Sequence, residues 1–322
     1  MSEDIDTHLL AKLGTLRQLE IFLKVAETGG IAQAAVQLHL SQPSVSIQVR
    51  KLAEAVGLPL YEVIGRRLKL SEAGRRVEAC GREIVDTLNR LNSSINDLKG
   101  LQAGTLKIAV DSSAKYFLPQ LLGPFCQRHP GVEVEFVEGK RSDLLERLAA
   151  NLDDFYIFNH IPGDRDITHY PFLPNPLVVV APKTHPLAAQ EEVTWEALNE
   201  ERIIIREQGS GTRYAIDEFL TRHQRSIHRA MPMASSEAIK LSVMAKMGVS
   251  IMSAYALVNA DADGLAQLRV EGFPIETQWH IIHLRQKQLS TLAQSFLNFM
   301  LEEGENHLPM DKIEERILQA HR

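Results

Sequence analysis

A run of short polar residues begins at Ser41, immediately before a helical pattern of apolar residues. Ser41 is a typical N-cap, and Pro43 is tolerated in the first turn of the helix that it opens. Hydroxyl and amide groups on the first turns of such a helix can read base edges in the major groove of DNA. An ordinary amphipathic helix with a polar face is the alternative. The candidate base-reading residues are Ser41, Gln42, Pro43, Ser44, Ser46 and Gln48, and Arg50 and Lys51 are candidate phosphate contacts.

Basic residues are concentrated around this run. Residues 15–76 hold nine Lys and Arg against five Asp and Glu, whereas residues 77–322 hold 25 against 33. In a chain of net charge −6, one basic segment favours contact with an anion through that segment alone. The cations Arg66, Arg67 and Lys69 follow Gly65 in a predicted β-hairpin, where they suit the minor groove and flanking phosphates. A solvated charge run is the alternative.

Three short helices must position the polar run. Apolar residues recur at helical spacing over residues 15–38, with a break at Gly29-Gly30, and the third helix ends near Gly57. Three helices with a short turn before the third are typical of a helix-turn-helix, and a hairpin at 60–70 would make it winged. The sequence therefore predicts an all-α DNA-binding part with a wing, over residues 15–73.

One long helical pattern follows, over residues 73–98. Its apolar residues alternate at spacings of three and four, and only Gly81 interrupts the seam. This pattern predicts a coiled coil of about three heptads that dimerises the chain, within a linker of residues 74–100. The alternative is a helix packed on its own domain. The predicted seam consists of Val77, Ile84, Leu88, Leu91, Ile95 and Leu98.

Strand and helix patterns alternate from residue 105 to residue 303. This alternation predicts two α/β lobes with parallel sheets. A late strand at 278–284 and a late helix at 290–301 are expected to return to the first lobe, so that two crossovers join the lobes. The tail of residues 304–322 is polar, with Ile313 and Ile317 four apart, and predicts an accessory helix.

Small hydroxyl residues and glycines lie at predicted helix starts and strand ends of this part. Such termini leave backbone N–H groups for an anion, and ligands of open α/β sheets bind outside the carboxyl ends of the strands. We expect these segments to converge on an interlobe cleft for a small anionic metabolite, although helix capping explains each of them equally well. The candidate effector-binding residues are Ser112, Ser113, Gly209, Ser210, Gly211, Thr212, Ser235 and Ser236, with the cations Lys115, Lys140, Arg206 and Arg213.

Other classes of function have weaker support. Ser112 and Lys115 match the serine–lysine pattern of acyl-transfer enzymes, but the companion S-D-N and K-T-G motifs are missing, so we predict no enzyme. Cys80 and Cys126 form no CxxC pattern, which suits a reducing cytoplasm and gives no metal site. A two-lobed solute-binding protein would need a secretion signal, and none is recognisable. No cofactor and no membrane contact are expected.

These residues resemble the LysR-type family of transcription regulators. The resemblance covers about residues 15–303. In the N-terminal part it is carried by TLRQL at 15–19, Ala34-Ala35, LSQPSVS at 40–46, LPLY at 58–61 and LSEAG at 70–74. In the C-terminal part, the segments 113–117, 128–134, 209–213, 236–240 and 271–274 are most similar to CbbR-like regulators of RuBisCO and other carbon-fixation operons. Related branches respond to sulfur metabolites, which keeps a sulfur regulator as the alternative.

The resemblance implies a winged helix-turn-helix, a long linker helix and a two-lobed, periplasmic-binding-protein-like effector domain. It implies a homodimer that pairs into a homotetramer on promoter DNA, contact with RNA polymerase, and a phosphorylated or carboxylate effector. Relatives usually begin the second helix with a hydroxyl and a basic residue, where this chain has Ala32 and Gln33. Gln33 is therefore the candidate DNA contact of that helix. Lys140 replaces the usual Asn, and the loop at 159–162 departs from the Gly-Arg-Pro-Pro type.

Overall fold

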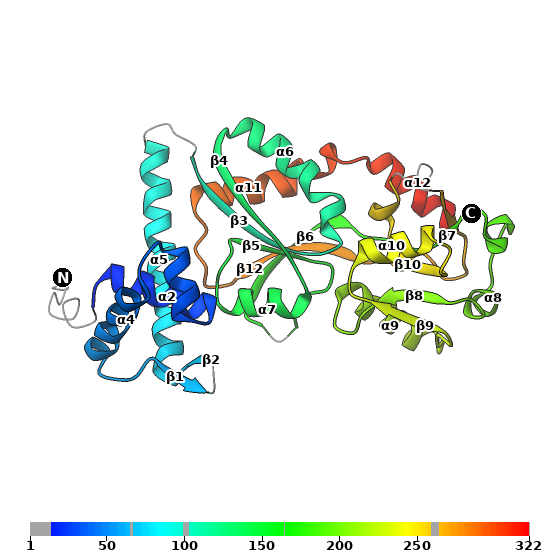
Figure 1. Ribbon diagram of the computed structural model, residues 1–322. Helices are drawn as coiled ribbons and strands as arrows, with labels where there is room; N and C mark the ends of the chain where they lie inside the picture. Colours follow the sequence, from blue (N-terminus) through cyan, green and yellow to red (C-terminus); the bar gives the residue numbers. More distant parts are fainter. Residues whose placement is uncertain (1–13, 65–66, 99–102, 164, 259–263, 322) are drawn as a thin grey trace. The chain divides into compact units, whose positions relative to one another are not determined.

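The computed structural model describes residues 14–64, 67–98, 103–163, 165–258 and 264–321. The chain divides into two compact units, Met1–Leu91 and Asn92–Arg322 (Figure 1).

The first unit is a winged helix-turn-helix, as the sequence predicts. Its helices α2 (Leu16–Thr28), α3 (Ile31–Gln37) and α4 (Gln42–Val56) enclose a core that includes Phe22 and Val45, and the antiparallel strands β1 (Tyr61–Ile64) and β2 (Arg67–Leu70) form the wing. Thr15 caps α2 in a capping box, and Gly29 ends that helix in the left-handed conformation. The turn between α3 and α4 is made by His39, at φ 53°. The local sequence signals for caps and turns therefore agree with the tertiary fold.

Helix α5 (Glu72–Leu98) begins in the first unit and contains the glycine that interrupts the apolar seam. A Cβ atom on Gly81 would lie 2.8 Å from Cδ1 of Leu19 and 3.3 Å from Cδ2 of Leu23, both on α2. Gly81 therefore faces α2, and the absence of a side chain lets the two helices approach. The gap in the seam is explained by packing within the unit.

Gly74 joins the wing to the start of α5. Its N–H donates to Oγ of Ser71, whose hydroxyl donates to the carbonyl of Pro59, and a Cβ on Gly74 would lie 1.9 Å from the carbonyl oxygen of Leu60. Because that neighbour is backbone, we expect Gly74→Ala to lower the free energy of unfolding by about 1–3 kcal/mol. Urea denaturation of the full chain would measure it. The control is Gly123→Ala, on a helix where a Cβ meets nothing within 4 Å; equal stability of both variants would contradict the packing argument.

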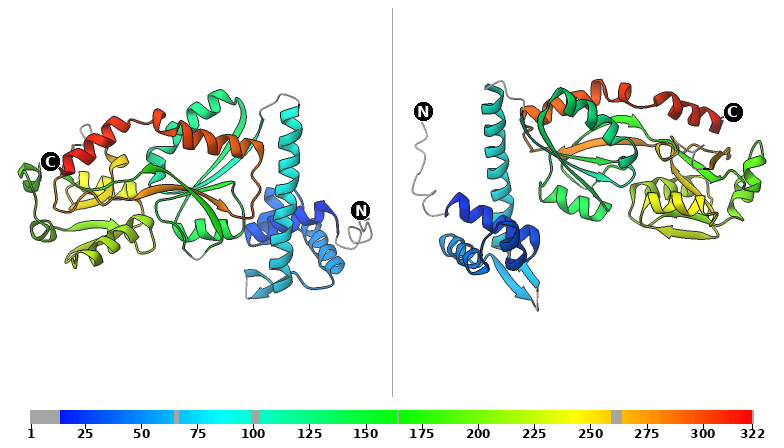
Figure 2. Two further views of the ribbon diagram at one scale, coloured as in Figure 1. Left: turned by 180° about the vertical axis from the view of Figure 1, so that it is seen from behind. Right: turned by 45° about the horizontal axis from the view of Figure 1, so that its top comes forward.

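The first lobe of the second unit is built on a five-stranded sheet of order β4-β3-β5-β12-β6. Helices α6 and α11 cover one face of this sheet, and α7 covers the other (Figure 2). Buried aromatic side chains such as Trp279 and Phe296 fill the first of these layers. The elements are β3 (Ala103–Asp111), α6 (Leu118–Arg128), β4 (Gly131–Gly139), α7 (Arg141–Ala149), β5 (Phe155–Phe158), β6 (Ile167–Pro174), β12 (Gln278–Leu284) and α11 (Thr291–Glu302).

The second lobe carries a sheet of order β11-β7-β10-β8-β9, with α9 on one face and α10 on the other. Its β8 strand, Ile203–Arg206, is fully buried, as expected for a strand covered on both faces. The elements are β7 (Leu177–Pro182), α8 (Trp195–Asn199), β8 (Ile203–Arg206), α9 (Gly211–Arg222), β9 (Ala230–Met233), α10 (Ser236–Met244), β10 (Val249–Ser253) and β11 (Leu265–Leu268).

The expectation of parallel sheets is wrong, because both sheets are mixed. β3 is parallel to β4 and β5, and β8 is parallel to β9 and β10, but β12 is antiparallel to β5 and β6, and β7 is antiparallel to β10 and β11. The antiparallel strands are those next to the two interlobe crossovers, which involve no helix. The crossovers are tied together by Asn175, whose Nδ2 donates to Oγ1 of Thr277 at 2.9 Å and whose Oδ1 accepts from Ser253.

The polar tail forms η4 (Gly304–His307) and α12 (Met310–His321). Ile313 of α12 is fully buried in the same core as α10, and the hydroxyl of Tyr255 lies 3.9 Å from the sulfur of Met310. The last helix therefore packs on the α10 side of the second lobe.

Candidate functional site

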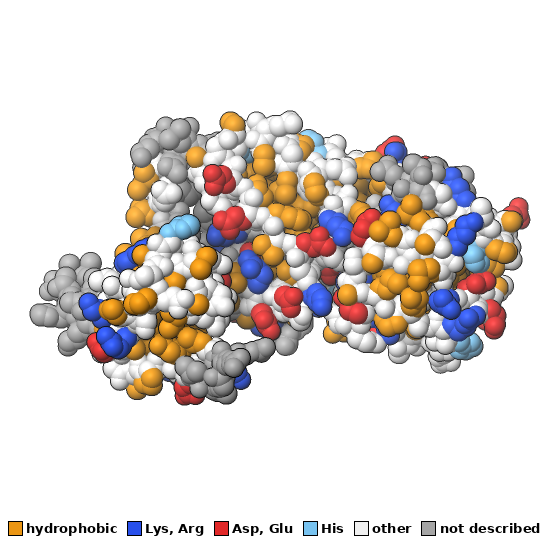
Figure 3. Space-filling view, viewed as in Figure 1, with side chains coloured by type: hydrophobic (Ala, Val, Ile, Leu, Met, Phe, Trp, Pro, Cys, Tyr) orange, Lys and Arg blue, Asp and Glu red, His pale blue; other side chains and the backbone are white. Residues whose placement is uncertain are grey.

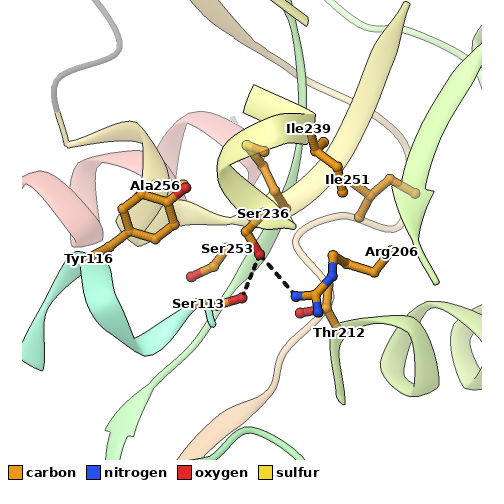
Figure 4. Close-up of a pocket in the computed structure, with 10 residues that line it drawn as sticks. Ser113, Tyr116, Arg206, Thr212, Ser236, Ile239, Ile251, Ser253 and Ala256 are labelled. Atoms are coloured by element: carbon orange, nitrogen blue, oxygen red, sulfur yellow. Dashed lines mark hydrogen bonds between the residues drawn. The ribbon is translucent and has the colours of Figure 1, made fainter. Parts of the chain in front are cut away.

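Three chain segments meet between the lobes of the second unit. They are the turn after β3, the end of β8 with the start of α9, and the start of α10 (Figure 4). The side chains of Ser113, Arg206, Thr212 and Ser236 line a cavity there, with Tyr116 at one side. Its volume for the centre of a water molecule is about 10 Å³, which holds about one water. The described conformation is therefore nearly closed.

Arg206 is the centre of this site. It is only 4% exposed, and its Nη1 donates to Oγ of Ser112 and to Oγ of Ser236, both at 3.0 Å. The hydroxyls of Ser113 and Ser236 are also 3.0 Å apart, so that one network joins the two lobes. Glu207 accepts from Nε and Nη2 of the same guanidinium at 3.0 Å each. A buried guanidinium among hydroxyls is well suited to bind an oxyanion.

The carboxylates of Asp111 and Glu207 lie beside the Arg206 guanidinium. Asp111 is 1% exposed and its Oδ1 lies 3.8 Å from Nη1 of Arg206, while its Oδ2 has no hydrogen-bond partner among the described atoms. Burial raises the pKa of Asp111, against the opposing charge of Arg206. Burial would lower the pKa of Arg206, but its hydrogen bonds with Glu207 and the charge of Asp111 raise it overall. The guanidinium is therefore charged throughout the accessible pH range.

The structure separates the predicted effector residues into two groups. Ser112, Ser113, Arg206, Thr212 and Ser236 meet at the network or line the cavity, whereas the other cations are not among the residues that line it. Lys115 pairs with Glu138 at 3.3 Å, Arg213 donates to Asp217 and to the carbonyl of Arg206, and Lys140 is an exposed residue before α7.

Two of the predicted serines act as helix caps. Oγ of Ser210 accepts from the N–H of Arg213, and Oγ of Ser235 accepts from the N–H of Ala238. The predicted Gly209 makes the turn before α9, at φ 88°. These residues therefore shape the starts of α9 and α10.

Asn159 belongs to the site although the sequence did not indicate it as a binding residue. Its Nδ2 donates to Oγ1 of Thr212 at 3.1 Å across the lobes, and its buried Oδ1 has no partner among the described atoms. A Cβ on Gly211 would lie 1.7 Å from that Oδ1, so the glycine makes room for the amide. Tyr116 was also missed; its hydroxyl donates to Glu237, and burial raises its pKa. For Asn159, the available signal in the sequence was a polar residue directly after the buried strand β5.

Helix α4 presents the predicted base-reading residues in the first unit. Its buried face consists of Val45, Val49 and Leu52, and Gln42 and Ser44 are exposed on the first turn. Ser41, Pro43, Arg50, Lys51 and Lys69 are exposed, Ser46 and Gln48 are half-buried, Gln33 is exposed on α3, Arg66 lies outside the described residues, and so does the side chain of Arg67.

The hydroxyls of Ser41 and Ser44 are 2.8 Å apart, and Oγ of Ser41 caps the N–H of Ser44. Gln42, between them, makes no hydrogen bond that holds its amide in the described part of the chain. We therefore expect Gln42→Ala to weaken binding to the specific operator by about 1–3 kcal/mol and to change binding to random DNA little. Electrophoretic mobility shifts on both DNAs measure this difference. Lys69→Ala on the wing is the contrasting variant, with an equal loss on both DNAs; the same equal loss for Gln42→Ala would refute base reading.

The predicted seam of α5 is largely solvent-exposed in the single chain. Ile84, Leu88, Leu91 and Ile95 are exposed by 38%, 43%, 55% and 38%, whereas Val77 packs against the core of the first unit. The side chain of Leu98 lies outside the described residues. A continuous apolar stripe of this kind needs a partner.

No helix in the described ranges is long and apolar enough to cross a membrane. No group of three or more His, Cys, Asp or Glu within those ranges has an arrangement that could hold a metal ion.

Comparison with known proteins links both units to one family. Residues 16–75 match the model of the bacterial regulatory helix-turn-helix protein of the lysR family, and residues 99–305 match the LysR substrate binding domain. The HTH-type transcriptional activator CmpR of Synechocystis is 44% identical over 91% of this chain and 97% of its own length. A RuBisCO operon transcriptional regulator of Acidithiobacillus ferrooxidans is 41% identical over 91% of this chain and 96% of its own length.

Solved structures show the same relationship. The regulatory domain of Synechocystis CcmR in complex with 2-PG is 39% identical, with a TM-score of 0.59 over 63% of this chain and 98% of that one. CbnR, a LysR family transcriptional regulator, shares the fold, with a TM-score of 0.62 and 23% identity over 89% of this chain and 98% of that one. With a winged helix-turn-helix in its first unit and a two-lobed effector domain in its second, the chain belongs to the LysR family of transcription regulators and binds DNA sequence-specifically under the control of a small molecule.

Proposed function

We propose that this regulator controls genes of carbon fixation or inorganic carbon supply in response to a small phosphorylated carboxylate that binds at Arg206. The observation that carries the proposal is a 4%-exposed guanidinium surrounded by three serine hydroxyls at the junction of two lobes. Relatives that are 44% and 41% identical are named for the activator CmpR and for the RuBisCO operon.

The chemistry of the site favours a compact anion with two acidic groups. Arg206 can bind one oxyanion at two points, and the hydroxyls of Ser113, Thr212 and Ser236 can donate to it. The starts of α9 and α10 add backbone N–H groups and favourable dipoles, each contributing about 0.3–1 kcal/mol. The 2-PG bound by the CcmR domain supports 2-phosphoglycolate as the first compound to test.

The assembly that we propose is a homodimer through α5, paired into a homotetramer on promoter DNA. A second apolar surface supports association of the second unit: Leu241, Met244 and Met247 are exposed by 53%, 37% and 39%, and hydrophobic side chains gather over α10 (Figure 3). Exposed apolar patches of this kind are typical of interaction sites. We further propose contact with RNA polymerase, no catalytic activity, and a location in the cytoplasm, where the promoter is.

Isothermal titration calorimetry on the full chain tests the effector class. The panel comprises 2-phosphoglycolate, a non-phosphorylated dicarboxylate, sulfate, thiosulfate and a neutral sugar. We expect 2-phosphoglycolate to bind most tightly and to change the footprint of the protein on its promoter. Preference for a sulfur oxyanion would favour regulation of sulfur metabolism instead, and binding of the neutral sugar alone would refute an anion site.

A further inference from the structure

Arg206 is already held in the way that an anionic ligand would hold it. Oε2 and Oε1 of Glu207 accept from its Nε and Nη2, both at 3.0 Å, which is the two-point geometry of a bound carboxylate or phosphate. The two N–H groups of Nη1 donate to Ser112 and Ser236. Four of the five N–H groups of the guanidinium are thus engaged: one on Nε, two on Nη1 and one on Nη2.

An effector therefore needs both space and hydrogen-bond donors that the described conformation does not offer. The cavity beside Arg206 has room for about one water molecule. Among the groups that bond or flank the guanidinium, Glu207 is the one nearest to solvent, with 28% of its side chain exposed. Asp111 and Ser236 are 1% and 6% exposed and are held in the interior. Glu207 is the partner that can leave with the least rearrangement.

A second cation, Lys140, directly follows the end of β4. Gly139, the residue before it, is the register partner of Asp111 at the end of β3, and Oδ1 of Asp111 lies 3.8 Å from Nη1 of Arg206. Lys140 precedes α7 in the first lobe, is exposed, and forms no ion pair within the part of the chain that the structure describes. Burial acts to raise the pKa of Glu207, but the hydrogen bonds and charge of Arg206, and after them the charge of Lys140, lower it overall. The carboxylate is thus ionised and within the electrostatic reach of a cation on the opposite lobe.

We propose that Glu207 is a built-in competitor of the effector: the anion displaces the Glu207 carboxylate from Arg206, and Glu207 then pairs with Lys140 across the cleft. This inference rests on the proposed function, because it requires that Arg206 receives an anionic group. It gives Lys140 the role of partner to the displaced carboxylate, in place of the direct ligand contact expected from the sequence. Because Glu207 belongs to the second lobe and Lys140 to the first, effector binding would add a link between the lobes.

Calorimetric titration of 2-phosphoglycolate into the full chain and its variants tests this exchange. We expect Glu207→Gln to bind about ten-fold more tightly than the unmodified chain, because a neutral amide competes less well for a guanidinium. We expect Lys140→Gln to bind more weakly by roughly three- to ten-fold. In the Glu207→Gln background, Lys140→Gln should change the affinity less than about two-fold, since no displaced charge remains to be paired.

Glu138→Gln is the matched control. It removes a carboxylate that pairs with Lys115 and is not hydrogen-bonded to Arg206, so it reports the general effect of one negative charge fewer. Equal or weaker binding by Glu207→Gln would show that Glu207 positions Arg206 for the ligand, and would overturn the competitor role. Additive effects of the two substitutions would overturn the exchange with Lys140.

Arg206→Gln distinguishes a failure of the proposed function from a failure of the competitor role of Glu207. If the unmodified chain binds and Arg206→Gln does not, the proposed function stands, and the result for Glu207→Gln decides the competitor role alone. If the unmodified chain binds neither 2-phosphoglycolate nor inorganic phosphate, the proposed function fails and the competitor role fails with it.

Discussion

Replacing Arg206 by Gln is expected to lower the affinity for 2-phosphoglycolate by about 2–5 kcal/mol, or roughly 30-fold to several thousand-fold. The guanidinium is buried and donates hydrogen bonds to Ser112 and Ser236. Among the described residues that line the cavity, Arg206 is the one with a charged side chain. Its loss removes a charge-assisted, two-point contact that a neutral amide does not restore. Arg206→Lys keeps the charge without the two-point geometry, so its affinity should lie between those of the unmodified chain and of Arg206→Gln. Calorimetric titration gives these affinities.

Arg206→Gln also leaves Asp111 buried without its counter-charge at 3.8 Å, so the variant needs a control for folding. The double variant Asp111→Asn with Arg206→Gln removes both charges and should recover stability in urea denaturation. It should still fail to bind the anion. Recovery of binding in the double variant would mean that the anion does not depend on Arg206, and would contradict the assignment of the site.

Replacing Leu88 by Asp is expected to abolish dimers and to lower operator affinity by at least about 100-fold. Leu88 lies in the exposed stripe of α5 and is 43% exposed in the single chain, so the substitution should leave the fold of each unit intact. A charge at an interior coiled-coil position faces its own copy in the partner, and a monomer loses the gain from binding two half-sites at once. Sedimentation and mobility shifts measure the two effects.

Asn89→Asp is the matched control for Leu88→Asp. It adds the same charge at the next exposed position of α5, outside the seam, and should remain dimeric. A monomeric Leu88→Asp protein that still protects the operator at the usual concentration would end the dimerisation argument. Loss of dimers in both variants would indicate a general sensitivity of the helix to charge.

The first unit could be predicted from the sequence because its signals are local. The cap at Ser41, the break at Gly29-Gly30 and the apolar spacing of α4 each involve neighbouring residues and agree with the observed helices. Gly81 was the exception, because the spacing of the apolar residues shows only that the seam is interrupted there and gives no reason for it. Only the position of Leu19 on α2 shows that this glycine faces the core of the unit.

The effector site could be predicted only in part, because its pieces meet through long-range contacts. Small hydroxyl residues at predicted helix starts and strand ends identified Ser113, Thr212 and Ser236, but the same pattern also included serines that only cap helices. The central role of Arg206 depends on the end of β8 meeting the turn after β3. Likewise, strand direction depends on which segments cross between lobes, so the alternation of strands and helices led to parallel sheets where the sheets are mixed.

A crystal structure of the full chain, grown with 2-phosphoglycolate, tests the central claim most directly. The account predicts the ligand between the lobes, with oxygen atoms of its phosphate or carboxylate within 2.7–3.1 Å of the Arg206 guanidinium, and with Ser113 or Ser236 as a further donor. A ligand bound elsewhere, or bound in the cleft with no oxygen near Arg206, would contradict it.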